Sequence, residues 1–548
     1  MGKAIVTTHF MLLSVILIPG LSWAGESGDD AHPSSHMEVD SLEAERRQPL
    51  IWREETPALR TERNADVIRV GLPATEMPDD FETTGPKIQS GDSALHHFAI
   101  RTGYAAPASD NLLPDFSAAR DIDGQRVLRV ELHSPSAEGL RLEFENLSML
   151  SEIELRIYDP TTGKVLGPFS SGLPSYEGKW WTPTIFGETI GLEFTVPAHL
   201  EMAELALPEV SRIMYIYCGE SCLRDSDRSA RALSCHNDIT CHSSWANGSG
   251  RAVGRMSFAR GNSNYACSGA LLNRSGSDRS PLFMTANHCI STESEARSLE
   301  VYWDFETGTC NGTPPSMGSL PRTLGATLAK RHSNSDWSLL GLLEPPHSTL
   351  YLGWRSASWT SGESAIGIHH PAGSHKRISF GESHRTNYYY PAYFNGDNSF
   401  WISISNARRV RYSNGTTQGG SSGSPIFDSQ GRVRGTLAGG SSGCPDGGTI
   451  TKYYGRLYSA FDNLRYYLSD IASPVYVNRN VSGDAGNDGD TERGTSTAPF
   501  NRLREATIAV ATGDEIRLRS GHYSENVTIW RSMTLNTDGS GPVVIGTQ

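Results

Sequence analysis

Apolar and polar residues alternate along two long stretches of the chain. From about residue 66 to 217, the runs RVLRVELHS, LRLEFENL and IELRIYDP change character at every second position, with turns rich in Gly, Pro and Ser between them. From Cys235 to about Pro474, shorter runs such as ACSGALLN, LEVYWDF and DWSLLGLL follow one another in the same way. Because successive side chains of a strand point to opposite faces, this pattern predicts an all-β chain. The first stretch favours a β-sandwich.

The N-terminus carries a pattern of another kind. Lys3 is followed by the apolar run FMLLSVILIPGL at 10–21 and then by the small-x-small triplet Ser22-Trp23-Ala24. The apolar run is shorter than the roughly 20 residues that a spanning helix needs. Residues 1–24 therefore predict a cleaved signal peptide and a secreted protein, with no membrane association once the signal is removed.

Two polar segments divide the rest of the chain. Residues 223–234, LRDSDRSARALS, have the composition of an exposed and cleavable linker. The second segment, VSGDAGNDGDTERG at 481–494, is acidic and rich in glycine. It precedes one helix-like run, FNRLREATIAVA, and several short strands that are similar to the first coil of a right-handed parallel β-helix. One such coil cannot bury its own core, and the sequence does not say what this tail packs against.

Composition and charge argue against a nucleic-acid-binding function. The chain has 548 residues, 37% hydrophobic and 20% charged, and a net charge of −13. Between Cys235 and Pro474 the balance is mildly basic, so the acid excess lies in the flanks. No dense basic patch with interleaved aromatic residues occurs, which argues against nucleic-acid binding.

The cysteines and histidines do not form a metal-binding motif. In an exported protein the eight cysteines favour disulfides, and neither C-x-x-C nor H-E-x-x-H occurs. The His369-His370 pair has no carboxylate or histidine at ligand spacing. Four residues of the acidic link could hold a structural calcium ion but lack the EF-hand spacing: Asp484, Asn487, Asp488 and Asp490. We expect no metal and no cofactor.

The stretch GGSSGSPIF at 419–427 admits three interpretations. It matches G-x-S-x-G, the nucleophile elbow of an α/β-hydrolase, with Ser421 as nucleophile. Shifted by one residue it matches G-x-S-G-x-P, the loop of a trypsin-like protease, with Ser422 as nucleophile. It could also be an ordinary turn.

The order of the histidines separates the first two interpretations. An α/β-hydrolase needs a histidine after its serine, and after Ser424 only His522 remains, in the tail. A protease of the trypsin type needs the order His, Asp, Ser. His288 ends the apolar run PLFMTANHCI, Asp336 opens the apolar run of NSDWSLLGLL, and Ser422 follows. Three such residues in this order, each beside a predicted strand, favour Ser422.

These motifs resemble those of the chymotrypsin-like serine proteases. The chain is also similar to the bacterial lysyl endopeptidases, through SCHNDITC, CSGALLN, TANHC, VYWDFETGTC, the HHP…KRIS pair, GSSGSPIF, SSGC and YGRLY in that order. The resemblance covers residues 235–474 and implies a double six-stranded antiparallel β-barrel there. It also implies that residues 25–234 are a pro-region with a β-sandwich-like fold, and it leaves residues 475–548 as the acidic link and a small β-helix-like segment.

The resemblance gives each motif residue a role. Ser422 would attack the scissile carbonyl, His288 would take and return the proton, and Asp336 would orient His288. The backbone N–H groups of Gly420 and Ser422 would form the oxyanion hole. The resemblance also implies three disulfides, which leave Cys218 and Cys222 to pair with each other: Cys235–Cys444, Cys241–Cys310 and Cys267–Cys289.

The chain departs from its relatives at the nucleophile loop. Ser421 stands where trypsin has the aspartate that binds the freed N-terminus, so that activation switch is missing. A pro-region that inhibits and assists folding, cleaved within about 223–234, would replace it. The candidate processing sites are Arg224, Arg228 and Arg231.

A second departure concerns the specificity pocket. The lysyl endopeptidases have an aspartate just before Tyr-Gly-Arg, and in TKYYGRLY the residue nearest that position is Lys452. Ala438 replaces the family's histidine two residues before Gly440. Three specificities stay open: cleavage after acidic residues by charge complementarity, another preference with Lys452 reaching solvent, or retained Lys/Arg cleavage through a carboxylate such as Asp446.

The sequence therefore predicts a secreted serine endopeptidase that is made as a zymogen. Its expected partners are peptide substrates and its own propeptide, and we expect a monomer. Two alternatives are a catalytically inert surface protein with a binding or adhesive role and an esterase with the same triad. Reaction with a fluorophosphonate and side-by-side ester and amide assays would separate them.

Overall fold

The structure is a computed structural model, and it describes the following residues: 37–38, 67–73, 99–109, 112–122, 124–147, 153–170, 173, 175–200, 207–217, 232–275, 280–348, 350–393, 401–441, 443–469, 473–483, 491–525, 527, 529 and 532–546. The predicted signal peptide, Cys218, Cys222, the three candidate processing arginines and the four candidate calcium ligands lie outside the described residues.

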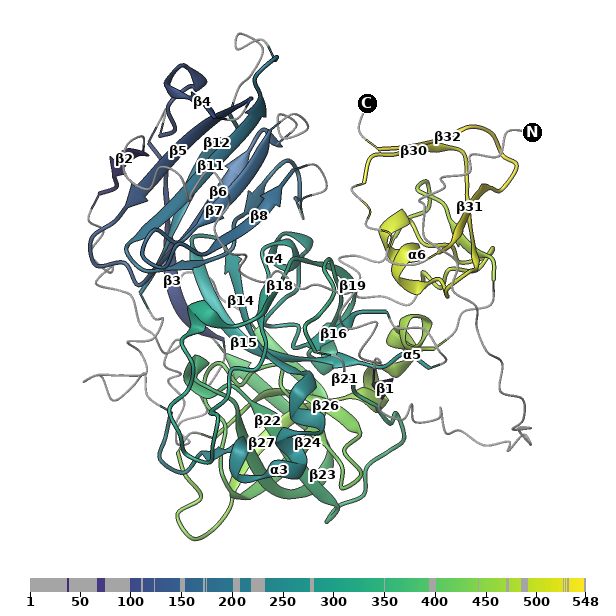
Figure 1. The fold of residues 1–548 in the computed structure, drawn as a ribbon. Helices are drawn as coiled ribbons and strands as arrows, with labels where there is room; N and C mark the ends of the chain where they lie inside the picture. The colour runs from purple at the N-terminus through teal and green to yellow at the C-terminus, as the bar shows by residue number, and fades with distance from the viewer. Residues whose placement is uncertain are drawn as a thin grey trace, which may run out of the picture.

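Two sheets form the predicted sandwich in the N-terminal third of the chain (Figure 1). One sheet has the order β2 (Val67–Gly71), β5 (Gln125–His133), β11 (Thr189–Pro197), β7 (Glu154–Tyr158) and β8 (Val165–Phe169), with β4 (Arg120–Ile122) beside β5. The other contains β10 (Ile185–Phe186), β6 (Gly139–Glu145), β12 (Glu209–Ile216) and β3 (Ile100–Pro107), with β9 (Trp180–Trp181) beside β6. Alternate apolar residues such as Val130, Leu142 and Phe194 are fully buried in one core, as the period of two predicts.

The residues after the linker begin with a first barrel. Its strands are β14 (Val253–Arg260), β15 (Ser263–Leu272), β16 (Leu282–Thr285), β20 (Trp337–Leu342), β19 (Ala326–His332), β18 (Arg322–Leu324) and β17 (Glu300–Tyr302), each antiparallel to its neighbours. Only Gly325 separates β18 from β19, so the two form one bent strand. The ring of six strands then closes where β17 pairs with β14.

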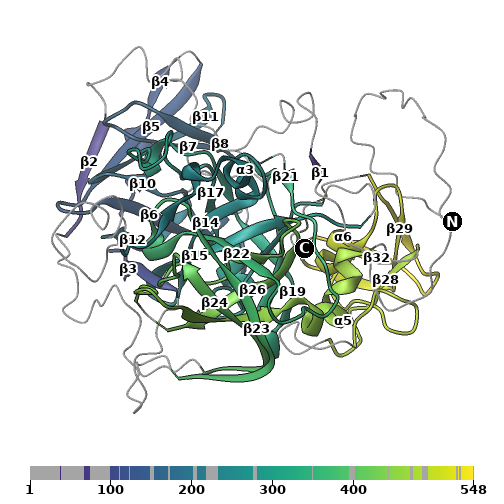
Figure 2. The same cartoon turned by 90° about the horizontal axis from the view of Figure 1, so that it is seen from below.

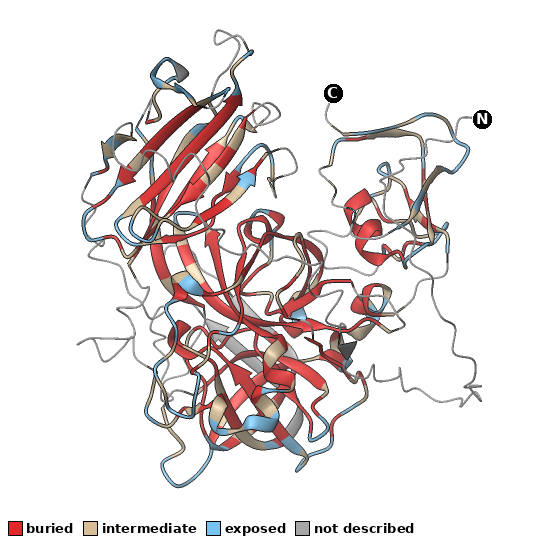
Figure 3. Cartoon of the chain, in the orientation of Figure 1, coloured by how far each residue is buried: buried red, intermediate tan, exposed pale blue. Residues whose placement is uncertain are grey.

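The second barrel closes in the same way. Its ring runs through β22 (Ser364–His369), β23 (Arg377–Tyr393), β24 (Trp401–Asn414), β27 (Ile450–Arg456), β26 (Val433–Gly440) and β25 (Pro425–Phe427), which pairs with β22 again. The short β13 (Asn237–Asp238) adds to the edge of β23. The double six-stranded barrel that the resemblance implied is confirmed, and the faces of the strands that meet inside it are buried (Figure 3).

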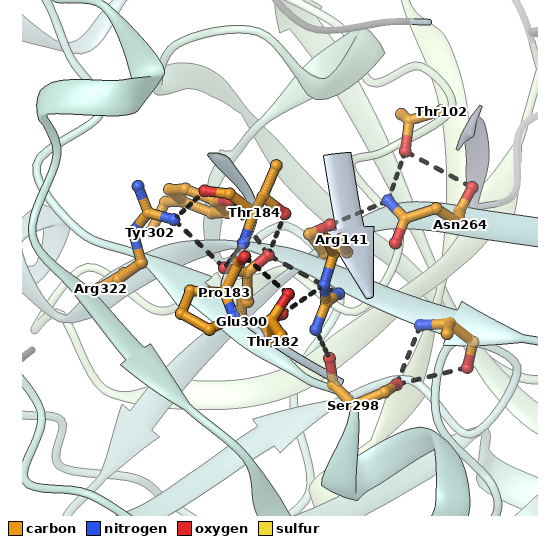
Figure 4. A network of polar contacts seen from close by, with 12 residues as sticks. Thr102, Arg141, Thr182, Pro183, Thr184, Asn264, Ser298, Glu300, Tyr302 and Arg322 are labelled. Carbon is orange, nitrogen blue, oxygen red and sulfur yellow. Dashed lines mark hydrogen bonds and ion pairs between the residues drawn. The ribbon is translucent and has the colours of Figure 1, made fainter. Parts of the chain in front are cut away.

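The sandwich joins the first barrel through a continuous sheet. Strand β3 pairs antiparallel with β15, so that Ile100 lies opposite Ala266 and Arg101 opposite Tyr265. Beside this seam, Glu300 of the barrel accepts hydrogen bonds from Thr184 of the sandwich and lies 3.6 Å from Arg141 and 3.3 Å from Arg322 (Figure 4). The two parts therefore share backbone hydrogen bonds and a buried ion cluster.

The tail is a small parallel coil that packs on the far side of the barrels from the sandwich (Figures 1 and 2). Strands β28 (Val475–Val477), β29 (Glu515–Leu518) and β31 (Thr534–Thr537) pair in parallel, as do β30 (Gly521–Tyr523) and β32 (Val543–Ile545). This is the β-helix-like segment that the pattern predicted.

The helices show what the tail packs against. Helix α6 (Leu503–Ala509) contacts β19 of the first barrel and α5 (Leu457–Leu468). The buried guanidinium of Arg274, at the end of β15, donates to the carbonyls of Ile508, Ala509 and Val510, where α6 ends. The barrel therefore supplies the partner that a single coil lacks. The two remaining helices are the short α3 (Ser243–Ala246) and α4 (Glu293–Arg297), among the described residues.

Among the helices that the structure describes, none combines the length and the apolar character needed to cross a membrane.

Candidate active site

His288 lies in a tight turn directly after β16. The disulfide between Cys267 of β15 and Cys289 fixes this turn to the neighbouring strand. Arg260, at the end of β14, donates to the carbonyls of His288 and Cys289 at 3.0 and 2.6 Å. The local sequence thus holds the backbone of His288 from two sides, and the ring is buried at 4% exposure.

Asp336 faces His288 from the start of β20. It ends the short 3₁₀ turn η8 (Ser333–Ser335) with a left-handed backbone, φ 52° and ψ 45°, which Asp tolerates better than most residues. Its Oδ2 lies 2.7 Å from His288 Nδ1, and its Oδ1 accepts the backbone N–H of His288 at 2.9 Å. Nδ1 therefore carries the proton that it donates to the carboxylate, and Nε2 of the neutral ring can accept one.

Ser422 lies in the turn before β25, in a loop that two glycines make possible. Gly420 has φ +86° and Gly423 φ +80°. A Cβ on Gly423 would lie 2.2 Å from Thr285 Oγ1 and 2.7 Å from the N atom of Ala286, so the loop touches the strand end that carries His288. Only glycine fits that approach.

Strand β15 anchors the same loop from below. The N–H of Ser268 donates to the carbonyl of Ser422 at 2.8 Å, and Ser268 Oγ donates to the carbonyl of Gly420 at 2.9 Å. These two hydrogen bonds hold the carbonyls of Gly420 and Ser422 against β15. Ser422 Oγ is buried, and no group in the described part of the chain forms a hydrogen bond with it.

The side chain of Ser421 is held by hydrogen bonds inside the protein. Its Oγ accepts the N–H of Gln418 at 3.2 Å and lies 2.8 Å from Nδ1 of His369, which is fully buried. The other ring nitrogen of His369 lies 3.2 Å from Ser379 Oγ, which donates to the carbonyl of Thr416. Burial and the neighbouring His236 lower the pKa of His369 well below its usual value. A neutral hydrogen-bond chain thus replaces trypsin's aspartate.

Sequence reasoning missed this role of His369, because the His369-His370 pair was weighed only as a metal site. The one signal was its position three residues before Ala372, whose N–H donates to the carbonyl of Gly419 in the nucleophile loop. In the described residues, no group of three or more His, Cys, Asp or Glu side chains is placed to hold a metal ion.

Lys452 is fully buried on β27, directly opposite Gly440 of β26. Its Nζ donates to the carbonyl of Thr417 at 2.8 Å and to that of Ser441 at 2.6 Å. Ala438 is also buried and carries no charge. Burial lowers the pKa of Lys452 to about 7.

Models of one protein family match both parts of the chain. The model described as "Lysyl endopeptidase, C-terminal domain" matches residues 229–455, and "Lysyl endopeptidase N-terminal domain" matches residues 105–214. A lysyl endopeptidase from Pseudomonas aeruginosa is 27% identical over 372 residues, which cover 64% of this chain and 76% of the relative. The chain is a lysyl endopeptidase-type serine protease. It is therefore an endopeptidase, and its substrates are polypeptides.

Two more distant similarities accompany this match. The secreted RxLR effector protein 73 of Plasmopara viticola is 29% identical over 221 residues, which cover 39% of this chain and 51% of that protein. The active form of the Rv3671c protease from M. tuberculosis is 14% identical over 44% of this chain and 92% of that chain, with a TM-score of 0.29.

The protease forms the three disulfides that the resemblance implies: Cys235–Cys444, Cys241–Cys310 and Cys267–Cys289. The first joins the start of this unit to the segment just after Ser441. The third fixes the turn of His288, as described above.

The start of the protease unit also reaches the nucleophile loop. The Oε1 atom of Gln418 accepts the N–H of Leu233 at 2.7 Å and lies 2.8 Å from Nε2 of His236. Leu233 belongs to the stretch 223–234 in which cleavage is expected, so a cut at any of the three arginines would leave this contact in the processed chain.

Of the three open specificities, the placement of Lys452 bears on two. Its ammonium does not reach solvent, which removes the interpretation in which the side chain extends outward. Asp446, the candidate replacement carboxylate for a Lys/Arg pocket, is exposed, in a turn with φ +44°. Lys452 is thus a buried basic residue, and the carbonyl that accepts one of its hydrogen bonds belongs to Thr417, five positions before Ser422.

Proposed function

We propose that this protease cleaves peptide bonds through an acyl-enzyme on Ser422. The observation that carries the proposal is the 2.7 Å contact between His288 Nδ1 and Asp336 Oδ2, because it leaves Nε2 of a neutral imidazole as the base. Ser422 Oγ attacks the scissile carbonyl carbon and its proton passes to His288 Nε2. Asp336 stabilises the imidazolium that forms.

The second half of the reaction returns the proton. The oxyanion of the tetrahedral intermediate is held by the N–H groups of Gly420 and Ser422. The C–N bond then breaks, and His288 gives its proton to the leaving amine. Water, deprotonated by His288, hydrolyses the ester on Ser422 and completes the cycle.

We infer further that the sandwich is a pro-region that covers the active site. Strand β3 pairs with β15 along the edge that continues to Ser268, which holds the loop of Ser422. Ile100 packs with Ala266 and Ala372, and its Cγ2 would lie 3.3 Å from a Cβ on Gly420. A strand added to this edge obstructs the approach of an extended peptide. Cleavage within about 223–234 and departure of the sandwich would expose it.

Secretion is part of the proposal. It is supported by the predicted signal peptide at 1–24 and by three disulfides, which persist in oxidising compartments.

Fluorophosphonate labelling tests the function directly. The processed protein should label, and Ser422→Ala should not, while Ser421→Ala should still label because Ser421 faces His369 rather than solvent. Absence of labelling in the processed wild type would favour the inert binding protein. Hydrolysis of an ester with no cleavage of the matched amide would favour the esterase.

The pro-region is tested on the same readout. The triple variant Arg224→Gln, Arg228→Gln, Arg231→Gln should stay unprocessed and label more slowly than the processed chain, because β3 covers the site. An uncut precursor that labels at the rate of the processed protein would contradict the inhibitory role.

A further inference from the structure

Among the residues of the protease that the structure describes, two lysines have no exposed surface at all, and their surroundings differ. Lys376 forms an ion pair with Glu306, whose Oε2 lies 2.8 Å from its Nζ. Lys452 lies within ion-pair distance of no carboxylate in the part of the chain that the structure describes, and its two partners are neutral carbonyls. An ammonium has three N–H donors, so one donor of Lys452 stays available. A buried charge without a counter-ion is costly unless a ligand supplies one.

The position of Lys452 relates this third donor to the reaction. Thr417, which accepts one of its N–H groups, lies five positions before Ser422 in the nucleophile loop. Ser441, which accepts another, follows the end of β26. The ammonium therefore lies among the nucleophile loop, the end of β26 and β27. In chymotrypsin-like proteases, the pocket that receives the residue before the scissile bond sets specificity.

We propose that Lys452 is the specificity-determining residue and that this protease cleaves after Asp and Glu. The inference rests on the proposed function of Ser422. The side-chain carboxylate of the substrate residue before the scissile bond accepts the remaining N–H of Lys452 Nζ and supplies the missing counter-ion. A lysine or arginine at that position would instead bring a second cation into a buried site, and charge complementarity works against it.

The residues around Lys452 are consistent with this pairing. Ala438 and Gly440 contribute no charge, and a Cβ on Gly440 would lie 2.9 Å from Cδ of Lys452. Gly440 therefore leaves room beside the lysine stem that any other residue would fill. Asp446 is exposed and does not occupy the position of the counter-ion.

The pH dependence follows from the ionisable groups that face Lys452. His236, before β13, and His369, on β22, both feel its charge, as they feel that of Arg377 on β23. Burial lowers the pKa of His236 to about 3 and that of His369 well below its usual value, so both stay neutral near pH 7. Lys452 is then the group that titrates there, charged below about pH 7 and neutral above it.

The test uses the processed protease and a set of internally quenched peptides that differ only in the residue before the scissile bond, with Glu, Asp, Gln, Leu or Lys. Wild type should cleave the Glu peptide with a kcat/KM on the order of a hundredfold above that of its neutral isostere Gln, the worth of a charge-assisted hydrogen bond in a buried site. Lys452→Met should remove this advantage and leave the Gln and Leu peptides unchanged. Lys452→Asp should move cleavage toward the Lys peptide.

Lys376→Met is the matched control, because it removes the other buried ammonium. It should lower stability and keep the Glu-to-Gln ratio. A wild type that cleaves Glu and Gln peptides equally, or prefers Lys, would overturn the inference, as would a Lys452→Met protein that keeps the ratio. If Lys452→Met does not fold, the wild-type ratio and its fall above about pH 7 decide the question.

Fluorophosphonate labelling distinguishes a failure of the specificity inference from a failure of the proposed function. If the processed protein labels on Ser422 but shows no preference for the Glu peptide, only the specificity inference fails. If it does not label, the proposed function fails.

Discussion

Two buried clusters of basic residues show how the surroundings of a charge indicate its role. At the seam between sandwich and barrel, Arg141 and Arg322 flank Glu300, and Thr184 donates its N–H to the same carboxylate at 2.9 Å (Figure 4). Burial acts against the charged form of Glu300, but the two guanidinium groups and Thr184 outweigh it and hold its pKa below the usual value. The carboxylate of this cluster is therefore paired with cations inside the protein.

Beside the nucleophile loop the arrangement is the reverse. Lys452 is just as deeply buried, and within the described part of the chain its Nζ donates only to the carbonyls of Thr417 and Ser441. The first cluster joins two parts of the chain, and its carboxylate and its cations all come from the protein itself. The second is complete only when an anion arrives, and it lies next to the residues proposed to do the chemistry. If this contrast holds, a substitution in the first cluster changes stability and a substitution in the second changes catalysis.

The largest expected effect is on the reaction itself. Ser422→Ala should lower kcat on the order of a millionfold, because nucleophile, base and orienting carboxylate act as one unit. The free energy of unfolding should stay close to wild type, since Ser422 Oγ has no hydrogen-bond partner among the described residues. Peptide assays and urea unfolding measure the two quantities. A large loss of stability would mean that Ser422 has a structural role instead.

Asp336→Asn should have the second largest effect and lower kcat by about ten-thousandfold. The amide would present an N–H to His288 Nδ1 and favour the wrong tautomer, although the geometry would change little. Retention of more than a tenth of wild-type kcat would contradict the role of Asp336.

Glu300→Gln should act on stability alone. It leaves Arg141 and Arg322 buried without a counter-ion, and breaking a buried ion pair in this way costs about 3–5 kcal/mol. Glu515→Gln is the matched control, because the Arg517–Glu515 pair lies at the surface, where such pairs contribute about 0–1 kcal/mol. Urea unfolding of the full chain measures both. Equal losses in the two variants would mean that the seam cluster does not hold the sandwich on the barrel.

The smallest expected effect is a change in a pH profile. Below about pH 7 the ammonium of Lys452 is charged and attracts a carboxylate, whereas above it the neutral amine does not. The kcat/KM for a Glu peptide should therefore fall by up to about tenfold per pH unit above 7. The profile for the matched Leu peptide should not show this fall, because its side chain makes no contact with a charge on Lys452. Parallel profiles for the two peptides would show that Lys452 does not contact the substrate.

Features carried by local patterns could be predicted from the sequence. The strands of both barrels follow from short strand-like runs separated by turns, and those of the sandwich from alternation. His288, Asp336 and Ser422 could be chosen because each lies at the edge of an apolar run in the order that the chemistry needs. Ser421 could be set aside because no downstream histidine serves it. The contact between His288 and Asp336 gives these choices a geometric basis.

Features that depend on distant segments could not be predicted. Thr184 and Glu300 are 116 positions apart, and nothing near either residue indicates that they meet. The burial of Lys452 depends on three segments that close around it, so the sequence left its orientation open. The hydrogen bonds of His369 to Ser421 likewise arise from the closure of the second barrel. Arg274 binds the end of α6 from more than two hundred positions away, and this explains how a single coil finds a partner.

The most direct test of the contrast between the two clusters is the ratio of kcat/KM for a Glu peptide to that for the otherwise identical Lys peptide, measured with the processed wild-type protease near pH 6.5. If Lys452 awaits a substrate carboxylate, this ratio is far above one, and Lys452→Asp inverts it. A ratio below one in the wild type would contradict the account, because a buried cation beside Ser422 would then be receiving a second cation.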